Sequence, residues 1–136
     1  MTAGLVVEDL SVSLPPGADR PLALSQVSLH VRPGEVLCLV GESGSGKSML
    51  ASAILRLLPP GVAVAGGRVA LDGEDLLPLP EAAMRRIRGA RIGMVFQDAS
   101  TALNPLHRVG DQVAEPLRTH TALTRAAVRA RVLDLL

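Results

Sequence analysis

The stretch Gly41-Glu42-Ser43-Gly44-Ser45-Gly46-Lys47-Ser48 decides the fold of this 136-residue chain. It matches the phosphate-binding pattern G-x-x-x-x-G-K-[S/T]. An apolar run at residues 36–40 precedes it, and a helix-favouring run at residues 49–55 follows it. Strand, glycine loop and helix in this order are the context in which the pattern binds phosphate. The sequence therefore predicts a P-loop at residues 41–48.

The residue types of this octamer suit a nucleoside triphosphate. Glycines let the backbone approach the phosphates and adopt unusual dihedral angles, so that the loop amides and the N-terminus of the next helix can face the anion. Lys47 is expected to contact the β- and γ-phosphates, and the Ser48 hydroxyl to bind Mg²⁺. The predicted cofactor-binding residues are Gly41, Glu42, Ser43, Gly44, Ser45, Gly46, Lys47 and Ser48.

Lys47 is the single lysine among the fourteen basic residues, and it stands where a compact point charge suits phosphate. The alternative interpretation of the octamer is a glycine-rich turn that caps a helix. The full pattern between a strand and a helix favours the phosphate site.

Composition argues against several other classes of function. The net charge of +1 gives no electrostatic case for a nucleic-acid partner, and the arginines at positions 85, 86, 88 and 91 are expected to form a solvated helix face. Cys38, the only cysteine, is predicted to be a buried thiol, which fits a reducing cytoplasm. No signal peptide and no run long enough to span a membrane is visible.

The chain is 48% apolar with a mean hydropathy of +0.34, yet Phe96 is its one aromatic residue. This composition suggests that part of its core is covered by something else.

Periodicity and turn residues predict the elements. We expect strands at residues 4–14 (with a bulge near Glu8-Asp9), 22–31, 35–40, 68–71 and 91–96, and helices at 46–58, 80–89, 108–120 and 124–136. The strands at 35–40 and 91–96 are apolar on both faces, which is typical of buried parallel strands. Pro116 should disturb its helix, and Thr124 should cap the last one.

Three further stretches resemble the ATPases of ABC transporters. Residues 91–97 end in Phe96-Gln97 and resemble the Q-loop, and residues 66–76 resemble the small antiparallel β subdomain of that family. Residues 100–106 with 109–112 are similar to the dipeptide, oligopeptide and nickel importer branch. The resemblance implies an incomplete α/β P-loop NTPase core, with the core and β subdomain at residues 1–97 and the start of the helical subdomain at residues 98–136.

The resemblance also implies roles. Residues 41–48 would bind ATP and Mg²⁺, with Lys47 acting in catalysis. Gln97 would approach the Mg²⁺ and the attacking water and transmit the nucleotide state to the helical subdomain and the membrane subunit. The alternative for Gln97 alone is a polar residue that ends a strand.

The chain departs from the family in three places. Residues 20–22 offer no aromatic to stack on adenine, and Ala99 replaces a usual proline. The signature motif, the Walker B aspartate, the catalytic glutamate and the switch histidine have no counterpart. Asp72 follows a Walker-B-like run, but its turn with Gly73 argues against a metal ligand. The histidines at positions 30, 107 and 120 are expected at the surface.

The sequence therefore predicts the ATP-binding part of an importer of peptides or a related substrate such as nickel. The implied partners are a second ATPase subunit (the same or a different chain), transmembrane permease subunits and, indirectly, a substrate-binding protein, on the inner face of the cell membrane. Two alternatives stay open. One is a module that binds a nucleotide without hydrolysing it, because hydrolysis would need a catalytic base that these residues lack. The other is a truncated fragment that does not fold stably.

Overall fold

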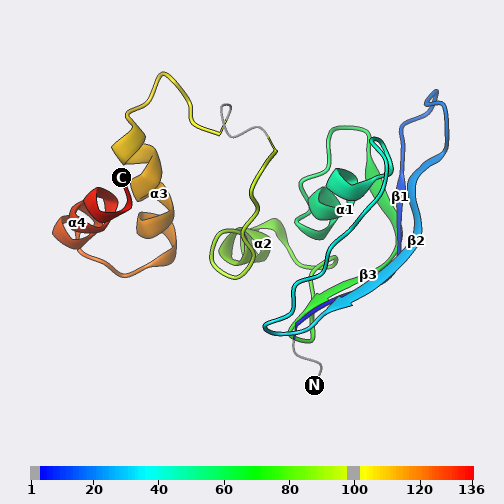
Figure 1. Cartoon of the computed structure of the whole chain (residues 1–136), viewed down its shortest axis with the longest axis horizontal. Coiled ribbons are helices and arrows are strands. Elements are labelled where there is room, and N and C mark those ends of the chain that lie inside the picture. Colours follow the sequence, from blue (N-terminus) through cyan, green and yellow to red (C-terminus); the bar gives the residue numbers. More distant parts are fainter. Residues whose placement is uncertain (1–3, 98–101) are drawn as a thin grey trace. The chain divides into compact units, whose positions relative to one another are not determined.

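A computed structural model describes residues 4–97 and 102–136 and divides the chain into two compact units, residues 1–84 and 85–136. Residues 98–101, which include Ala99 and the first two residues of the predicted importer-like stretch at 100–106, lie outside the described residues. In chain order the elements are β1 (Leu5–Ser13), β2 (Leu22–Val31), α1 (Lys47–Ile54), β3 (Ala63–Leu71), β4 (Glu74–Asp75), α2 (Glu81–Ile87), α3 (Val109–His120) and α4 (Arg125–Leu135), as Figure 1 labels them.

The first unit is built on an antiparallel sheet with strand order β2-β1-β3-β4. The strands predicted at residues 4–14 and 22–31 are confirmed, and the one predicted at 68–71 begins earlier, at Ala63. Asp72 and Gly73 join β3 to β4 with φ angles of 51° and 87°, as a two-residue hairpin turn requires. The Asp72 carboxylate accepts a hydrogen bond from the Gly4 amide at 2.8 Å. The Asp72 side chain therefore has a structural role.

Two bulges bend the neighbouring strands β1 and β2. The predicted bulge is confirmed at Asp9, which has a φ of 48°, and β2 has another at Gln26, also with a φ of 48°. Serine hydroxyls satisfy the amides that leave the ladder. Ser28 Oγ accepts from the Asp9 amide at 2.8 Å, and Ser11 Oγ accepts from the Gln26 amide at 2.9 Å.

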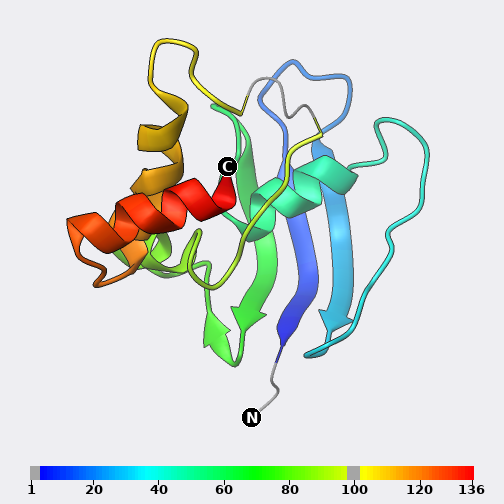
Figure 2. The ribbon, with the colours of Figure 1, turned by 60° about the vertical axis from the view of Figure 1, so that its left-hand side comes forward.

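Helix α1 covers one face of this sheet (Figure 2). The strands alternate, so that one set of side chains points toward the helix and the other set toward solvent. The largest fully buried side chains of the sheet are Val7, Leu10, Val12 and Val69, and α1 contributes Leu50, Ala53 and Ile54. This apolar layer holds the helix that follows the P-loop.

Helix α1 ends earlier than predicted, at Ile54 rather than near Leu58. The Leu57 amide donates to the Ser52 carbonyl at 2.8 Å, and the Arg56 amide donates to the Ala53 carbonyl at 3.0 Å. These two bonds form a Schellman motif, whose left-handed position is normally glycine but here is Arg56 with a φ of 53°. The Arg56 guanidinium donates to the carbonyls of Leu76 and Leu79, which anchors the unusual residue.

The two predicted parallel strands are wrong for this structure. Residues 36–40 and 93–96 have no regular secondary structure, and a single bridge pairs Arg88 with Ile92. Val40 and Val95 are 95% and 96% exposed. A parallel strand needs partners at its edges and cover on its faces, and no described strand pairs with either segment. Cys38 is exposed for the same reason, which corrects the predicted buried thiol.

In the second unit, α3 and α4 pack around Ala114, Val128 and Val132. The predicted cap is confirmed, since Thr124 Oγ1 accepts from the Ala127 amide at 3.3 Å. Helix α3 continues through Pro116, so the expected interruption does not occur. Val113 and Leu117 also pack on this core, whereas Val109 and Leu135 are about half exposed.

Helix α2 ends near Gly89, as predicted, with a φ of 81° at that residue. The predicted solvated helix face is confirmed for Arg85 and Arg86, which are exposed on α2. Arg91 is exposed beyond the end of the helix, and Arg88, also beyond it, is half-buried. Among residues 4–97 and 102–136, no helix has the length and apolar character needed to cross a membrane.

Gly67→Ala should lower the free energy of unfolding by about 2–4 kcal/mol, from left-handed strain plus overpacking. Gly67 has a φ of +97°, and an added Cβ would lie 2.5 Å from Leu10 Cα at the bulge of β1. Gly66→Ala is the matched control, because its Cβ would meet nothing within 4 Å. Urea denaturation of both variants measures the difference, and equal losses would contradict the bulge contact.

The exposed apolar residues of 36–40 and 93–96 should make the isolated 136-residue chain loosely packed and prone to self-association. We expect strong binding of a hydrophobic dye and a broad thermal transition, measured beside light scattering. A sharp, cooperative melt of a monomer would show that these segments are protected in solution.

Candidate functional site: a glycine loop at a helix N-terminus

The predicted P-loop residues form one continuous loop that leads into α1. Gly44 and Gly46 have φ angles of 81° and 95°, and Ser45 between them does not have a positive φ. This alternation is the backbone form in which successive amides turn toward one side and make an anion site. The Ser45 amide closes a turn on the Glu42 carbonyl at 3.2 Å. The loop therefore has the conformation that the glycines predicted.

Lys47 is the first residue of α1, and its side chain folds back across the loop. Its Nζ donates to the carbonyls of Gly41 and Glu42, both at 2.8 Å, and to Ser45 Oγ at 3.0 Å. The ammonium is thus held at the mouth of the loop by three acceptors. An anion at the loop meets this charge and the N-terminal end of α1, whose first turn contains no acidic residue.

Gly46 has no room for a side chain. An added Cβ would lie 2.7 Å from Leu24 Cδ2 and 3.3 Å from the carbonyl oxygen of Ala23. The start of β2 therefore packs directly on the residue that caps α1. Leu50 fixes the same corner, since its amide donates to the Gly46 carbonyl at 2.8 Å and its side chain is buried.

The residues present fit a hydrated Mg²⁺ better than a metal held by protein carboxylates. Ser48 is exposed in the first turn of α1 and offers a hydroxyl oxygen. No group of three or more His, Cys, Asp or Glu side chains within residues 4–97 and 102–136 could hold a metal ion. Mg²⁺ keeps several waters and takes few protein ligands beside phosphate oxygens, so one hydroxyl next to a phosphate loop is sufficient.

Gln97 is exposed and belongs to the second unit, so its predicted role beside the P-loop stays a prediction. His30 and His107 are exposed as expected, whereas His120 is half-buried. An added Cβ on Gly89 would lie 3.0 Å from His120 Nε2, so the imidazole packs on that glycine.

Sequence reasoning missed two polar contacts. Arg20 Nη2 donates to the Gly44 carbonyl at 3.4 Å, although residues 20–22 were considered only for the aromatic they lack. In the second unit, the Gln112 amide group pins the turn at 104–107. Its Oε1 accepts from the Asn104 amide at 2.7 Å, and its Nε2 donates to the carbonyls of Asn104 and His107 at 2.9 and 3.0 Å. Neither contact has a local sequence signal.

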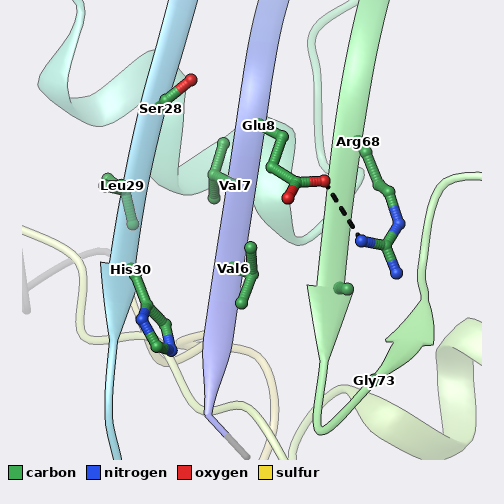
Figure 3. A pocket seen from close by; sticks show the side chains of 9 residues that line it. Val6, Val7, Glu8, Ser28, Leu29, His30, Arg68 and Gly73 are labelled. Carbon is green, nitrogen blue, oxygen red and sulfur yellow. Dashed lines mark hydrogen bonds and ion pairs between the residues drawn. The ribbon is translucent and has the colours of Figure 1, made fainter. Parts of the chain in front are cut away.

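A second hollow lies on the sheet itself and has a volume of about 540 Å³. Figure 3 shows Glu8 and Arg68 pointing toward each other there, with 3.1 Å between Oε2 and Nη1. Arg68 also pairs with Asp75 at 3.5 Å. The hollow is open and its charges neutralise one another, so the glycine loop is the stronger candidate site.

Comparison with known proteins decides the family. The ABC transporter family model matches residues 24–135, most of the chain. This chain belongs to the ABC transporter family. The sequence-based family assignment is therefore confirmed.

Three similar proteins illustrate the relationship. The peptidoglycan transport ATP-binding protein YejF of Agrobacterium fabrum is 49% identical over 97% of this chain and 24% of its own length. The oligopeptide transport ATP-binding protein OppD of Bacillus subtilis is 41% identical over the whole chain and 38% of its own length. The ATP-binding cassette MJ0796, solved as a dimer with ADP and phosphate, superposes with a TM-score of 0.78 and 27% identity, over 96% of this chain and 54% of its own.

The coverage values show how much of each relative this chain matches. The chain spans between a quarter and two fifths of the two transport proteins and about half of the solved cassette. The likeness to the cassette confirms the predicted fold class, part of a P-loop ABC ATPase domain with a small antiparallel sheet.

Gly46→Ala should weaken MgATP binding by about tenfold or more, because the new Cβ meets Leu24 and the left-handed φ is strained. Gly34→Ala is the matched control. It carries the same kind of strain at a φ of +75°, but its Cβ meets nothing within 4 Å. Titration calorimetry should show full MgATP affinity in the control. An equal loss of affinity there would mean that backbone strain alone, and not the contact with Leu24, lowers the affinity.

Proposed function

We propose that this chain is the phosphate-binding part of an ATPase subunit that powers the import of peptides or a related substrate such as nickel. The observation that carries the proposal is the Lys47 ammonium held over a left-handed glycine loop at the start of α1. Its relatives include an oligopeptide transport ATP-binding protein, which supports the substrate class.

In this proposal residues 41–48 bind the triphosphate of ATP. The loop amides and Lys47 bind the β- and γ-phosphate oxygens, and Lys47 stabilises the charge that develops during phosphoryl transfer. Ser48 would hold Mg²⁺, which would supply positive charge against the phosphate oxygens. Gln97 would position the attacking water and report the nucleotide state.

The proposed division of labour follows the chain. Residues 1–97 form the nucleotide-binding core with its β subdomain, and residues 98–136 begin the helical subdomain. The proposed partners are a second ATPase subunit, identical or not, and permease subunits that receive substrate from a binding protein. The proposed location is the cytoplasmic face of the cell membrane, where the subunit is bound peripherally.

A second candidate is a nucleotide-binding module without hydrolysis, because a phosphate loop alone can bind a nucleotide but hydrolysis also needs a base to activate water. The size of the native product separates the candidates, by immunoblot and intact mass from its own cell. A product about twice this mass or larger supports the ATPase subunit. A product of this mass would argue against ATP hydrolysis and support the module that only binds the nucleotide.

Lys47→Ala in the full-length gene product should lower Mg-ATPase activity about a hundredfold or more, because the developing phosphoryl charge loses the ammonium held over the loop. Peptide uptake by cells that carry this variant should fall with it. Lys47→Arg should also lose ATPase activity, because the planar guanidinium does not replace the compact ammonium group. Arg32→Ala, at the far end of β2, is the control. Unchanged ATPase activity in Lys47→Ala would overturn the proposal.

A further inference from the structure

Arg20 contacts the outside of the P-loop from a different part of the chain. It lies in the connection between β1 and β2, and its Nη2 donates to the Gly44 carbonyl at 3.4 Å. A few residues later, Leu24 of β2 packs on Gly46, where an added Cβ would lie 2.7 Å from Leu24 Cδ2. Residues 20–24 therefore lie against the loop at both of its left-handed glycines, at one by a hydrogen bond and at the other by packing.

The bond from Arg20 holds one end of the peptide unit that joins Gly44 to Ser45. The other end is the Ser45 amide, which donates to the Glu42 carbonyl at 3.2 Å. A trans peptide is planar, and its carbonyl and amide point in opposite directions, so the two bonds together fix the rotation of the whole unit. Glycine permits more backbone conformations than any other residue, so the orientation of this peptide depends on such bonds.

The same hydrogen bonds connect Arg20 to the lysine of the loop. The Glu42 carbonyl, which accepts from the Ser45 amide, also accepts from Lys47 Nζ at 2.8 Å. Lys47 Nζ donates to Ser45 Oγ as well, at 3.0 Å. Rotation of the peptide between Gly44 and Ser45 would therefore disturb the atoms that position the ammonium.

Arg20 is placed to shape the anion site and not to touch the anion. It binds a carbonyl oxygen, the negative end of the peptide dipole, whereas a phosphate is bound by amides. The alternating dihedral angles of Gly44, Ser45 and Gly46 turn successive amides to one side of the loop. A cation on the Gly44 carbonyl supports this arrangement from behind and does not compete with Lys47 for the phosphates.

The backbone that carries Arg20 is itself held in place. Directly after it, the Pro21 carbonyl accepts a hydrogen bond from the Leu14 amide at 2.9 Å. An added Cβ on Gly61 would lie 3.2 Å from Pro15 Cβ, so the segment after α1 packs on the same connection. The connection is therefore a fixed support from which Arg20 reaches the loop.

We propose that Arg20 is a positioning residue of the nucleotide site, which holds the peptide between Gly44 and Ser45 from outside so that the loop amides and Lys47 face the phosphates. The inference rests on the proposed function, because the loop that is positioned must bind a nucleotide. The contact involves the loop and no part of the nucleotide. Its effect should therefore not depend on the base, and it should lower KM for ATP without changing kcat.

The test is calorimetric titration of the full-length gene product with ATP, GTP and inorganic tripolyphosphate, beside steady-state ATPase kinetics. Arg20→Ala should weaken the binding of all three ligands by the same factor of about three, the size expected for one exposed hydrogen bond from a charged donor. KM for ATP should rise by that factor, and kcat should stay unchanged. A misfolded fraction would instead lower the binding stoichiometry and kcat.

Two further variants separate the hydrogen bond from other effects. Arg20→Lys keeps a charged donor of similar reach, so it should restore the affinity to within about twofold of the unaltered protein. Arg32→Ala removes an equal charge about 30 Å away, at the far end of β2, and should bind ATP normally. The loss in Arg20→Ala should persist at about 1 M salt, where the Debye length is about 3 Å and distant charges are screened.

Each of four results would overturn the inference. Unchanged affinity in Arg20→Ala would show that the contact does not matter, and a loss for ATP alone would assign Arg20 to the nucleoside. A loss that disappears at high salt would make Arg20 a distant charge, and a fall in kcat with an unchanged KM would place its effect in the chemical step. The proposed function fails separately, if the unaltered protein binds neither ATP nor tripolyphosphate.

Discussion

The close approach of Gly46 to β2 is the constraint on which the candidate site depends. With no Cβ at this position, the backbone at the start of α1 can pack against Leu24 and the Ala23 carbonyl. The buried side chains of α1 then settle on the sheet, and the helix axis is fixed relative to the strands. The glycine loop is therefore oriented by the core of the antiparallel sheet, not by the apolar segment that precedes it.

This arrangement separates two properties that P-loops usually combine. The local geometry of the loop is complete, with left-handed glycines, a folded-back lysine and a helix N-terminus without acidic residues. The parallel strand that normally leads into such a loop is not formed, because no described strand pairs with residues 36–40. The conformation of the loop is thus built from its own residues, one helix and the antiparallel sheet, without a parallel strand before it.

The sequence predicted what depends on neighbouring residues and missed what depends on distant ones. Three features depend only on their own dihedral angles and on local hydrogen bonds, so that a local sequence pattern predicts them. They are the turn at Asp72-Gly73, the helix cap at Thr124 and the octamer that begins at Gly41. Arg56 ends α1 only because carbonyls twenty or more positions away accept its guanidinium, which no local pattern reveals. Arg20 and Gln112 are likewise recognisable only in three dimensions. The position of Gln97 beside the loop follows from the family resemblance alone and stays a prediction, because Gln97 lies in the second unit and the loop in the first.

The paired bulges of β1 and β2 have a consequence for how this sheet meets other chains. Strand β2 is an edge of the described sheet, and a flat edge offers amides and carbonyls as a template for intermolecular strand addition. The bulge at Gln26 interrupts that template, because it breaks the regular spacing of the strand, while the Gln26 amide itself faces β1 and donates to the Ser11 hydroxyl. The sheet thus resists growth by cross-chain pairing at the strand whose Leu24 packs on the glycine loop.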